Sequence, residues 1–184
     1  GMQKKVLTEV DLYYGEIKTP KGFEIDRNTI KHSIVKSWIT AKRKSNNEKD
    51  YAYRDYQVEF SQPLQWFQDY IRDHYNGEFH KSLITKNIFG NVYKENESSP
   101  TRHHLEAVDL RNSPDYTLIY SIDVGKGSSE VVIEYDDNRR AGRTWHIPLE
   151  NNHFVMFPAS QKYMISPNTS NKTNIILTIT YEYI

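Results

Sequence analysis

The sequence predicts an α+β protein, mainly β, in which N-terminal helices support a sandwich, jelly roll or barrel of strands. Two observations carry this prediction. The first half contains two stretches with apolar residues at helical spacing, and the second half contains seven short β-rich runs separated by turn residues. The 184 residues suffice for one domain with a substantial core. We expect a single domain over 1–184, with a helical support over 1–86 and a β core over 87–184.

Two amphipathic helices are expected in the first half. The first spans residues 27–42, and either Asp26 or Asn28 can cap its N-terminus. The second follows Ser61 and ends at Asn76-Gly77, a common helix stop. The apolar face of the first helix repeats at i, i+4, i+8 and i+11: Ile30, Ile34, Trp38 and Ala41. Each helix therefore has one face that must be buried against another element.

The second half is expected to form strands only. Many short strands joined by tight turns, at spacings of about 8–14 residues, are typical of a sandwich, jelly roll or barrel. Two facing sheets would leave a cavity between them, and the preceding helices would cover one outer face. The expected strands are NIFGNVYKE, DYTLIYSIDV, SEVVIEYDD, RTWHIPLE, HFVMFP, YMISP and NIILTITYEYI.

Composition excludes several classes of function. Lys+Arg and Asp+Glu both number 24, so no net charge attracts the chain to nucleic acid or to an anionic membrane. The chain has no cysteine, which leaves His, Asp, Glu, Tyr and backbone oxygen as metal ligands, a set suited to iron, manganese or zinc. No apolar run reaches the roughly 18–20 residues of a membrane span, and none has signal-peptide character. A cytoplasmic protein without nucleic-acid or membrane partners is expected; the oligomeric state is left open.

The densest group of potential metal ligands is Arg-His-His-Leu-Glu at residues 102–106. Side chains two residues apart in a strand point to the same side, so His104 and Glu106 point together, into the cavity or into solvent. One histidine and one carboxylate are two of the three ligands in the facial triad of non-heme Fe(II) oxygenases. His103 faces the opposite way from His104, so at most one of the two is a ligand.

The order of motifs resembles the double-stranded β-helix oxygenases that use Fe(II) and 2-oxoglutarate, particularly the small members found in phage and marine bacterial genomes. Three segments carry the resemblance: HHLE at 103–106, DYTLIYSIDVGKGSSEVVI at 115–133 and FVMFPASQKYMISPNTSNKTNIILTI at 154–179. It covers residues 87–184. The resemblance implies a double-stranded β-helix, also described as jelly-roll or cupin-like, with Fe(II) and 2-oxoglutarate as cofactors.

The resemblance also implies an iron site made from particular residues. His104 and Glu106 take the positions of the first two ligands, and Tyr163 takes the position where the family has its distal histidine. A phenol with an ordinary pKa of about 10 is a poor iron ligand unless its environment changes it. Histidines that could replace one of these ligands, if the fold brings them close, are His103, His146 and His153.

The family's 2-oxoglutarate-binding arginine falls at Asn174 in this sequence. An asparagine cannot form the bidentate ion pair that an arginine makes with a carboxylate. Lys162 and Arg143 are the candidate replacements, and Arg139 and Arg140 are further cations nearby in the sequence. The cosubstrate site is therefore expected, by resemblance, among Lys162, Asn174 and Arg143.

Three functions follow from these expectations. The first is an Fe(II)/2-oxoglutarate-dependent oxygenase, hydroxylase-like, or a diverged relative, acting on a small molecule or a protein side chain. The second is a β-helix without that chemistry that binds a metabolite, sugar or protein partner; its many tyrosines suit the walls of a binding site. The third is a structural or assembly protein of phage type that associates through strand edges.

Overall fold

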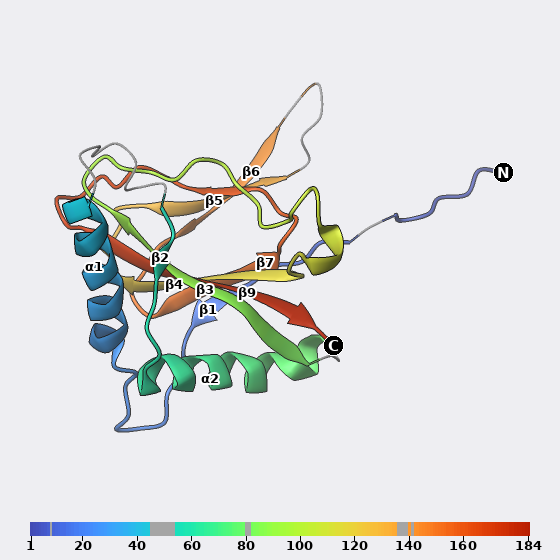
Figure 1. The fold of residues 1–184 in the computed structure, drawn as a ribbon. Helices are drawn as coiled ribbons and strands as arrows, with labels where there is room; N and C mark the ends of the chain where they lie inside the picture. The colour runs from blue at the N-terminus through green and yellow to red at the C-terminus, as the bar shows by residue number, and fades with distance from the viewer. Residues whose placement is uncertain (8, 45–53, 80–81, 136–139, 141) are drawn as a thin grey trace.

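The computed structural model describes residues 1–7, 9–44, 54–79, 82–135, 140 and 142–184. Two antiparallel sheets face each other, and two helices lie outside the larger sheet (Figure 1). This arrangement confirms the mainly β fold with supporting helices that the sequence predicts. No helix in the described ranges is both long and apolar enough to cross a membrane.

The larger sheet has six strands and the smaller sheet has three. In spatial order the larger sheet contains β1 (Tyr13–Glu16), β7 (His153–Pro158), β4 (Tyr116–Asp123), β9 (Asn174–Tyr183), β3 (Leu83–Tyr93) and β2 (Tyr56–Gln57). The smaller sheet contains β6 (Arg143–Pro148), β5 (Glu130–Tyr135) and β8 (Tyr163–Ile165). A short 3-10 helix, Leu110–Asn112, precedes β4. Strands β1 to β4 belong to the larger sheet, and from β4 onward the chain crosses repeatedly between the sheets: β5 and β6 lie in the smaller sheet, β7 in the larger, β8 in the smaller and β9 in the larger. Such crossings enclose the interior of a jelly roll.

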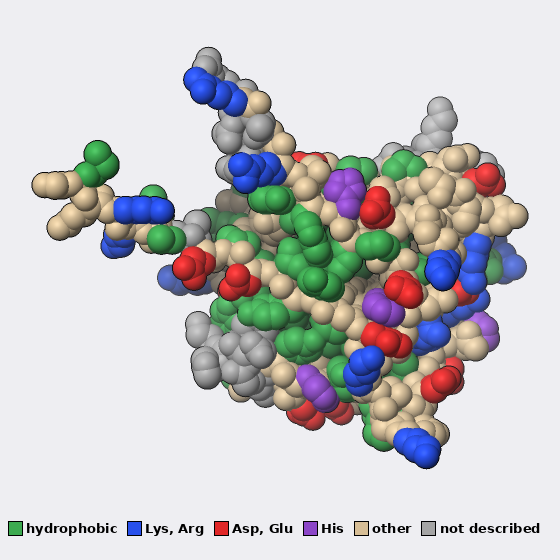
Figure 2. Space-filling model, turned by 180° about the vertical axis from the view of Figure 1, so that it is seen from behind, with side chains coloured by type: hydrophobic (Ala, Val, Ile, Leu, Met, Phe, Trp, Pro, Cys, Tyr) green, Lys and Arg blue, Asp and Glu red, His purple; other side chains and the backbone are tan. Residues whose placement is uncertain are grey.

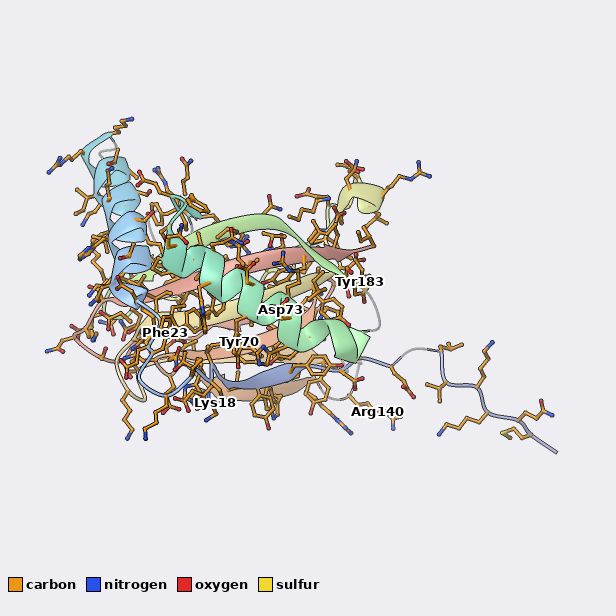
Figure 3. All side chains as sticks on the ribbon, turned by 90° about the horizontal axis from the view of Figure 1, so that it is seen from below. Lys18, Phe23, Tyr70, Asp73, Arg140 and Tyr183 are labelled. Carbon is orange, nitrogen blue, oxygen red and sulfur yellow. The ribbon has the colours of Figure 1, made fainter. Side chains whose placement is uncertain are left out.

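Both predicted helices form, with small differences at their ends. Helix α1 spans Arg27–Lys44, and the Asp26 carboxylate caps it by accepting hydrogen bonds from the Thr29 hydroxyl and amide. Helix α2 spans Gln62–Phe79 and continues two residues beyond the predicted stop. It lies across the large sheet, where the Tyr70 hydroxyl accepts a hydrogen bond from the Lys18 backbone amide at 3.1 Å (Figure 3).

The strands divide the hydrophobic core into two parts. On β4, Leu118 and its neighbours of the same parity face the helices and join Ile30, Ile34, Phe67 and Ile71 in the outer core. Residues of the other parity, such as Ile119, face the smaller sheet. Apolar side chains fill much of this interior: Tyr93, Ile119, Val124, Val131, Ile133, Leu149, Val155, Phe157, Tyr163, Ile165 and Ile176. Both faces of β4 and β9 are buried, which explains their nearly continuous apolar sequence.

Strands β1 and β2 were not predicted. Strand β1 has four residues with Gly15 among them, and β2 has two, so neither shows a β-rich run in the sequence. Each lies at an edge of the large sheet, where one neighbouring strand suffices: β1 pairs with β7, and β2 pairs with β3. Strand β1 places Tyr14 in the wall of a cavity between the two sheets.

Gly90 allows α1 to approach β3 closely. A Cβ atom at this position would lie 2.5 Å from Ile34 Cγ1 and 2.6 Å from Ile34 Cγ2. We expect Gly90→Ala to lower the free energy of unfolding by about 1–3 kcal/mol, because added volume in a packed core forces displacement. Urea denaturation measures this change. Gly15→Ala is the matched control, since its Cβ would meet Phe154 at an ordinary 3.8 Å; equal losses in the two variants would contradict the prediction.

Candidate functional site

The segment that carries the predicted ligands is attached to β8 by backbone hydrogen bonds. The Arg102 amide donates to the Tyr163 carbonyl at 2.8 Å, and the Tyr163 amide donates to the Arg102 carbonyl at 2.9 Å. The His104 amide donates to the Ala159 carbonyl at 2.9 Å. Residues 102–104 therefore run antiparallel to β8 at the open end of the barrel, and the sequence positions identified by resemblance lie close together in space.

His104 and Tyr163 form a direct side-chain hydrogen bond. The His104 Nε2 atom lies 2.6 Å from the Tyr163 hydroxyl oxygen, and the two rings stack with centroids 5.6 Å apart. Tyr163 is 3% exposed and also packs against Phe157, with ring centroids 5.1 Å apart. The three rings thus form a continuous row from the polar side of the barrel to its apolar interior.

Both members of this pair are held in their neutral forms. Burial, reinforced by the Arg102 charge, lowers the pKa of His104 to about 4. Burial raises the pKa of the Tyr163 phenol well above its ordinary value, although Arg102 acts in the opposite direction. At neutral pH, with no metal bound, the pair is a neutral imidazole bonded to a protonated phenol.

An ion pair that the sequence did not predict fixes the same segment. The Arg102 guanidinium donates to both oxygens of Asp55, at 2.9 and 3.1 Å, and lies over the Phe89 ring. Asp55 also accepts a hydrogen bond from the amide of Asn91 on β3, at 2.9 Å. Bidentate geometry gives such a pair both strength and a defined orientation. The Arg102 charge is therefore already neutralised by a carboxylate of the chain itself.

Glu106 and His103 share a polar pocket with His104. The pocket has a volume of about 380 Å³, and its lining includes all three of these side chains and Arg102. Glu106 is exposed; its backbone amide donates to the Ser113 hydroxyl at 2.7 Å, and its carbonyl accepts from the Asp109 amide at 3.0 Å. The described residues contain no group of three or more His, Asp or Glu side chains arranged to hold a metal ion.

The other predicted histidines lie away from this pocket. His146 alternates with Trp145 on β6, so it points to the opposite face of the small sheet from Trp145 and Tyr163. Its Nδ1 atom lies 3.3 Å from Glu130. His153 lies at the far end of β7 from Phe157, with Nε2 3.6 Å from Glu150.

Asn174, at the position of the family's arginine, is fully used within the fold. It is 0% exposed; its side-chain oxygen accepts a hydrogen bond from the Gly125 amide, and its side-chain nitrogen donates to the Ser128 hydroxyl, both at 2.9 Å. These bonds connect the start of β9 to the turn after β4. The Asn174 side chain is therefore buried and bonded to the fold at both its oxygen and its nitrogen.

The candidate cations are at the surface. Lys162 is exposed and lies next to the largest cavity, and Arg143 is exposed at the start of β6, opposite Tyr135. Arg140 is also exposed, and Arg139 lies outside the described residues. The interior between the sheets is occupied by apolar side chains.

A larger cavity than the polar pocket lies between the edges of the two sheets. It has a volume of about 710 Å³ and contacts Tyr14 of β1, Tyr135 of β5, Trp145 of β6 and Phe157 of β7. Tyr14 and Trp145 meet across the opening with ring centroids 5.4 Å apart. Figure 2 shows a broad tract of hydrophobic side chains on this face of the molecule. The volume is typical of a site for a small organic ligand.

These observations test whether the residues present suit Fe(II) and 2-oxoglutarate. The imidazole nitrogen that would face iron is bonded to a protonated phenol, and the asparagine in the cosubstrate position is committed to the fold. The interior between the sheets is lined by apolar side chains rather than by a cation. The residues present do not fit this metal and cosubstrate pair in the way that the resemblance implies.

Comparison with known proteins gives matches in structure only. No protein-family model matches the sequence, and no curated protein matches it. A Pseudomonas putida prolyl-4-hydroxylase superimposes with a TM-score of 0.60 and 10% identity, covering 93% of this chain and 91% of that one. The viral collagen prolyl hydroxylase of Paramecium Bursaria Chlorella virus-1, solved as a 2OG complex, gives 0.58 and 13%, with 92% and 95% covered.

A third similar structure is the non-heme alpha ketoglutarate dependent carbocyclase SnoK from nogalamycin biosynthesis. Its TM-score is 0.60 at 10% identity, covering 91% of this chain and 78% of that chain. The similarity extends over nearly the whole chain, helices included, whereas the identities are too low to transfer an activity. By its architecture and these structural neighbours, this chain has the jelly-roll fold of the Fe(II)/2-oxoglutarate oxygenases.

Proposed function

We propose that this protein is a diverged relative of the Fe(II)/2-oxoglutarate oxygenases that binds a small organic molecule in its barrel and does not carry out 2-oxoglutarate-dependent oxidation. The hydrogen bond between His104 Nε2 and the Tyr163 hydroxyl is the observation that carries the proposal. Tyr163 stands where the resemblance expects a third iron ligand, and in this bond its side chain is a neutral phenol. Function is read from the site rather than from the fold, because one fold supports many functions.

The contacts around this pair support a structural role for residues that resemble a metal site. His104 and Tyr163 join the 102–106 segment to β8, and the Arg102–Asp55 ion pair joins it to the strand region before β2. These side-chain bonds add to the backbone hydrogen bonds between Arg102 and Tyr163 that already join the same segment to β8. A metal ion is not required to connect the same segments.

The cavity beside Tyr14 and Trp145 supports the binding half of the proposal. At about 710 Å³ it lies within the usual range for small-molecule sites, and aromatic side chains from four different strands contribute to its lining. Phe157 lines this cavity and packs against Tyr163, whereas His104 lines the polar pocket and not the cavity. A ligand in the cavity would therefore contact the aromatic walls and not His104.

An anaerobic titration tests the proposal directly. Metal-free protein is mixed with Fe(II) and 2-oxoglutarate, and the metal-to-ligand absorption band and the iron retained after desalting are measured. We expect no band and no retained iron in the wild type, and no change in either measurement for His104→Ala. An oxygenase of the same fold that binds 2-oxoglutarate, such as the viral collagen prolyl hydroxylase, is the positive control.

The competing hypothesis is an active oxygenase with His104, Glu106 and Tyr163 as ligands. It predicts the absorption band in the wild type, its loss in His104→Ala, and oxygen-dependent formation of succinate from 2-oxoglutarate. Any stoichiometric iron complex that depends on His104 would overturn the proposed function and support this alternative.

A further inference from the structure

We infer that residues 2–10 of a second copy of this chain dock across the opening of the 710 Å³ cavity, and that two copies exchange these segments to form a symmetric dimer. Residues 2–10 are called the arm, and the structure describes all of them except Thr8. The dimer goes beyond the proposed function, because it concerns what covers the cavity and not what the cavity binds.

The arm carries apolar side chains that its own chain leaves exposed. It projects from the body of the protein as an extended segment (Figure 1). Its exposed apolar side chains are Met2 at 100%, Val6 at 60%, Leu7 at 90% and Val10 at 57%. Three of the five residues at 6–10 are β-branched, a type that favours strands. Within the part of the chain that the structure describes, the arm nevertheless pairs with no strand.

The opening of the cavity offers exposed rings and two strand edges. Strand β1 is the edge of the larger sheet and β6 the edge of the smaller one. Tyr14 of β1 is 61% exposed, and Tyr135 at the end of β5 is 42% exposed. Exposed apolar surface and strand edges both mark places where another chain can add. An arm laid across the opening would cover these rings from outside, without entering between Tyr14 and Trp145, which already touch.

Charges of both signs at the cavity match charges of both signs on the arm. The lining includes the carboxylates of Asp11 and Glu134 and the exposed ammonium group of Lys162. The arm adds three charged side chains: Lys4, Lys5 and Glu9. No ion pair of Lys4, Lys5 or Lys162 is found among the described residues. Opposite charges brought together across an interface steer association and fix its register.

The direction of the chain favours the arm of a second copy over the protein's own arm. Residues 10–12 already line the cavity, and the arm leads away from there, so the protein's own arm would have to reverse to cover the opening. A tight hairpin usually needs glycine or asparagine, and none occurs between Met2 and Tyr14. Because each copy carries both the arm and the opening, a reciprocal exchange makes the same contact twice and closes a twofold dimer.

Sedimentation equilibrium of the full chain measures this association. We expect a dimer of twice the 21.7 kDa monomer mass. Val6→Asp combined with Leu7→Asp should weaken the dimer at least about tenfold, because charges replace apolar contacts. Tyr135→Asp, at the opening, should weaken it as well. Phe60→Asp is the matched control at a 72% exposed apolar side chain outside the cavity, and it should leave the dissociation constant unchanged. Circular dichroism confirms that each variant is folded.

Mixing two defective variants tests the exchange itself. Tyr135→Asp damages the opening and keeps the arm, whereas the Val6→Asp, Leu7→Asp variant damages the arm and keeps the opening. Neither variant should associate with itself. Their mixture should form a mixed dimer through the one intact arm and the one intact opening. Native mass spectrometry identifies this mixed dimer when one variant is labelled with nitrogen-15.

The outcomes are independent of the proposed function. A wild-type chain that stays monomeric up to about 1 mM, a dimer that neither the arm variant nor Tyr135→Asp weakens, or a mixture without mixed dimers would overturn the exchange. None of these results would alter the iron measurement. A His104-dependent iron complex in the wild type would overturn the proposed function and leave the dimer unaffected.

Discussion

Replacing Tyr163 by histidine is expected to create a metal site that the wild-type chain lacks. Tyr163→His would place an imidazole opposite His104 Nε2, with Glu106 beside the same pocket as a carboxylate donor. Co(II) serves as a spectroscopic substitute for Fe(II). We expect it to bind to the Tyr163→His variant at least about 100-fold more tightly than to the wild type, a difference in binding free energy of about 2.8 kcal/mol. Absorption spectroscopy and calorimetry with Co(II) measure this affinity.

The physical reason is the length of the two side chains. The Tyr163 oxygen reaches to within 2.6 Å of His104 Nε2, which leaves no room for an ion between them. A histidine ring on the same backbone ends closer to β8 and opens a gap, and metal–imidazole bonds of about 2.0–2.1 Å can span it. The new ligand is also neutral and basic at pH 7, whereas the buried phenol is protonated.

Two matched variants control this experiment. Tyr163→Phe removes the phenol oxygen without adding a ligand, and it should leave Co(II) affinity unchanged. Adding His104→Ala to Tyr163→His should remove the new affinity, because one of the two imidazoles is lost. Tight Co(II) binding by Tyr163→Phe, or by the wild type, would show that the phenol is not what prevents metal binding.

The order of strands and turns could be predicted because it depends on local sequence signals. The pair Pro167-Asn168 illustrates this. The Asn168 side-chain amide donates to the carbonyls of Tyr93 and Lys172, and its oxygen accepts from the Ser170 amide. An asparagine that organises its own turn leaves a recognisable motif in the sequence. The turn lies within residues 154–179, one of the three segments that carry the resemblance to the oxygenases.

The arrangement of the site could be predicted only in part. Spacing placed His104 and Glu106 near each other, and resemblance placed Tyr163 opposite them. The hydrogen bond between the two rings depends on how β8 aligns with residues 102–104, which no local pattern specifies. Asp55 and Tyr14 come from segments with no β-rich run, so their contributions could be found only once the strands were assembled.

Substituting Asn174 is expected to destabilise the fold more than any change at the surface. Asn174→Ala leaves the half-buried Gly125 amide without its acceptor, while the Ser128 hydroxyl loses one bond and keeps the one that it donates to the Gly125 carbonyl. A polar group left unsatisfied costs about 1–3 kcal/mol, so we expect the free energy of unfolding to fall by about 1–3 kcal/mol. Urea denaturation measures this loss. Asn171→Ala, at an exposed position in the same turn, is the control and should change stability by less than about 0.5 kcal/mol.

Asn174→Arg makes the complementary test, because it installs the residue that the family has at this position. We expect this variant to unfold at lower urea concentration than Asn174→Ala and to gain no measurable affinity for 2-oxoglutarate. The site is 0% exposed, so a guanidinium there would be buried among groups already bonded to one another, without a carboxylate partner. A stable Asn174→Arg variant that binds 2-oxoglutarate would mean that the cosubstrate pocket persists in this barrel. The iron position and the cosubstrate position thus differ in kind: one substitution can recreate a metal ligand at Tyr163, whereas the fold itself depends on the asparagine at 174.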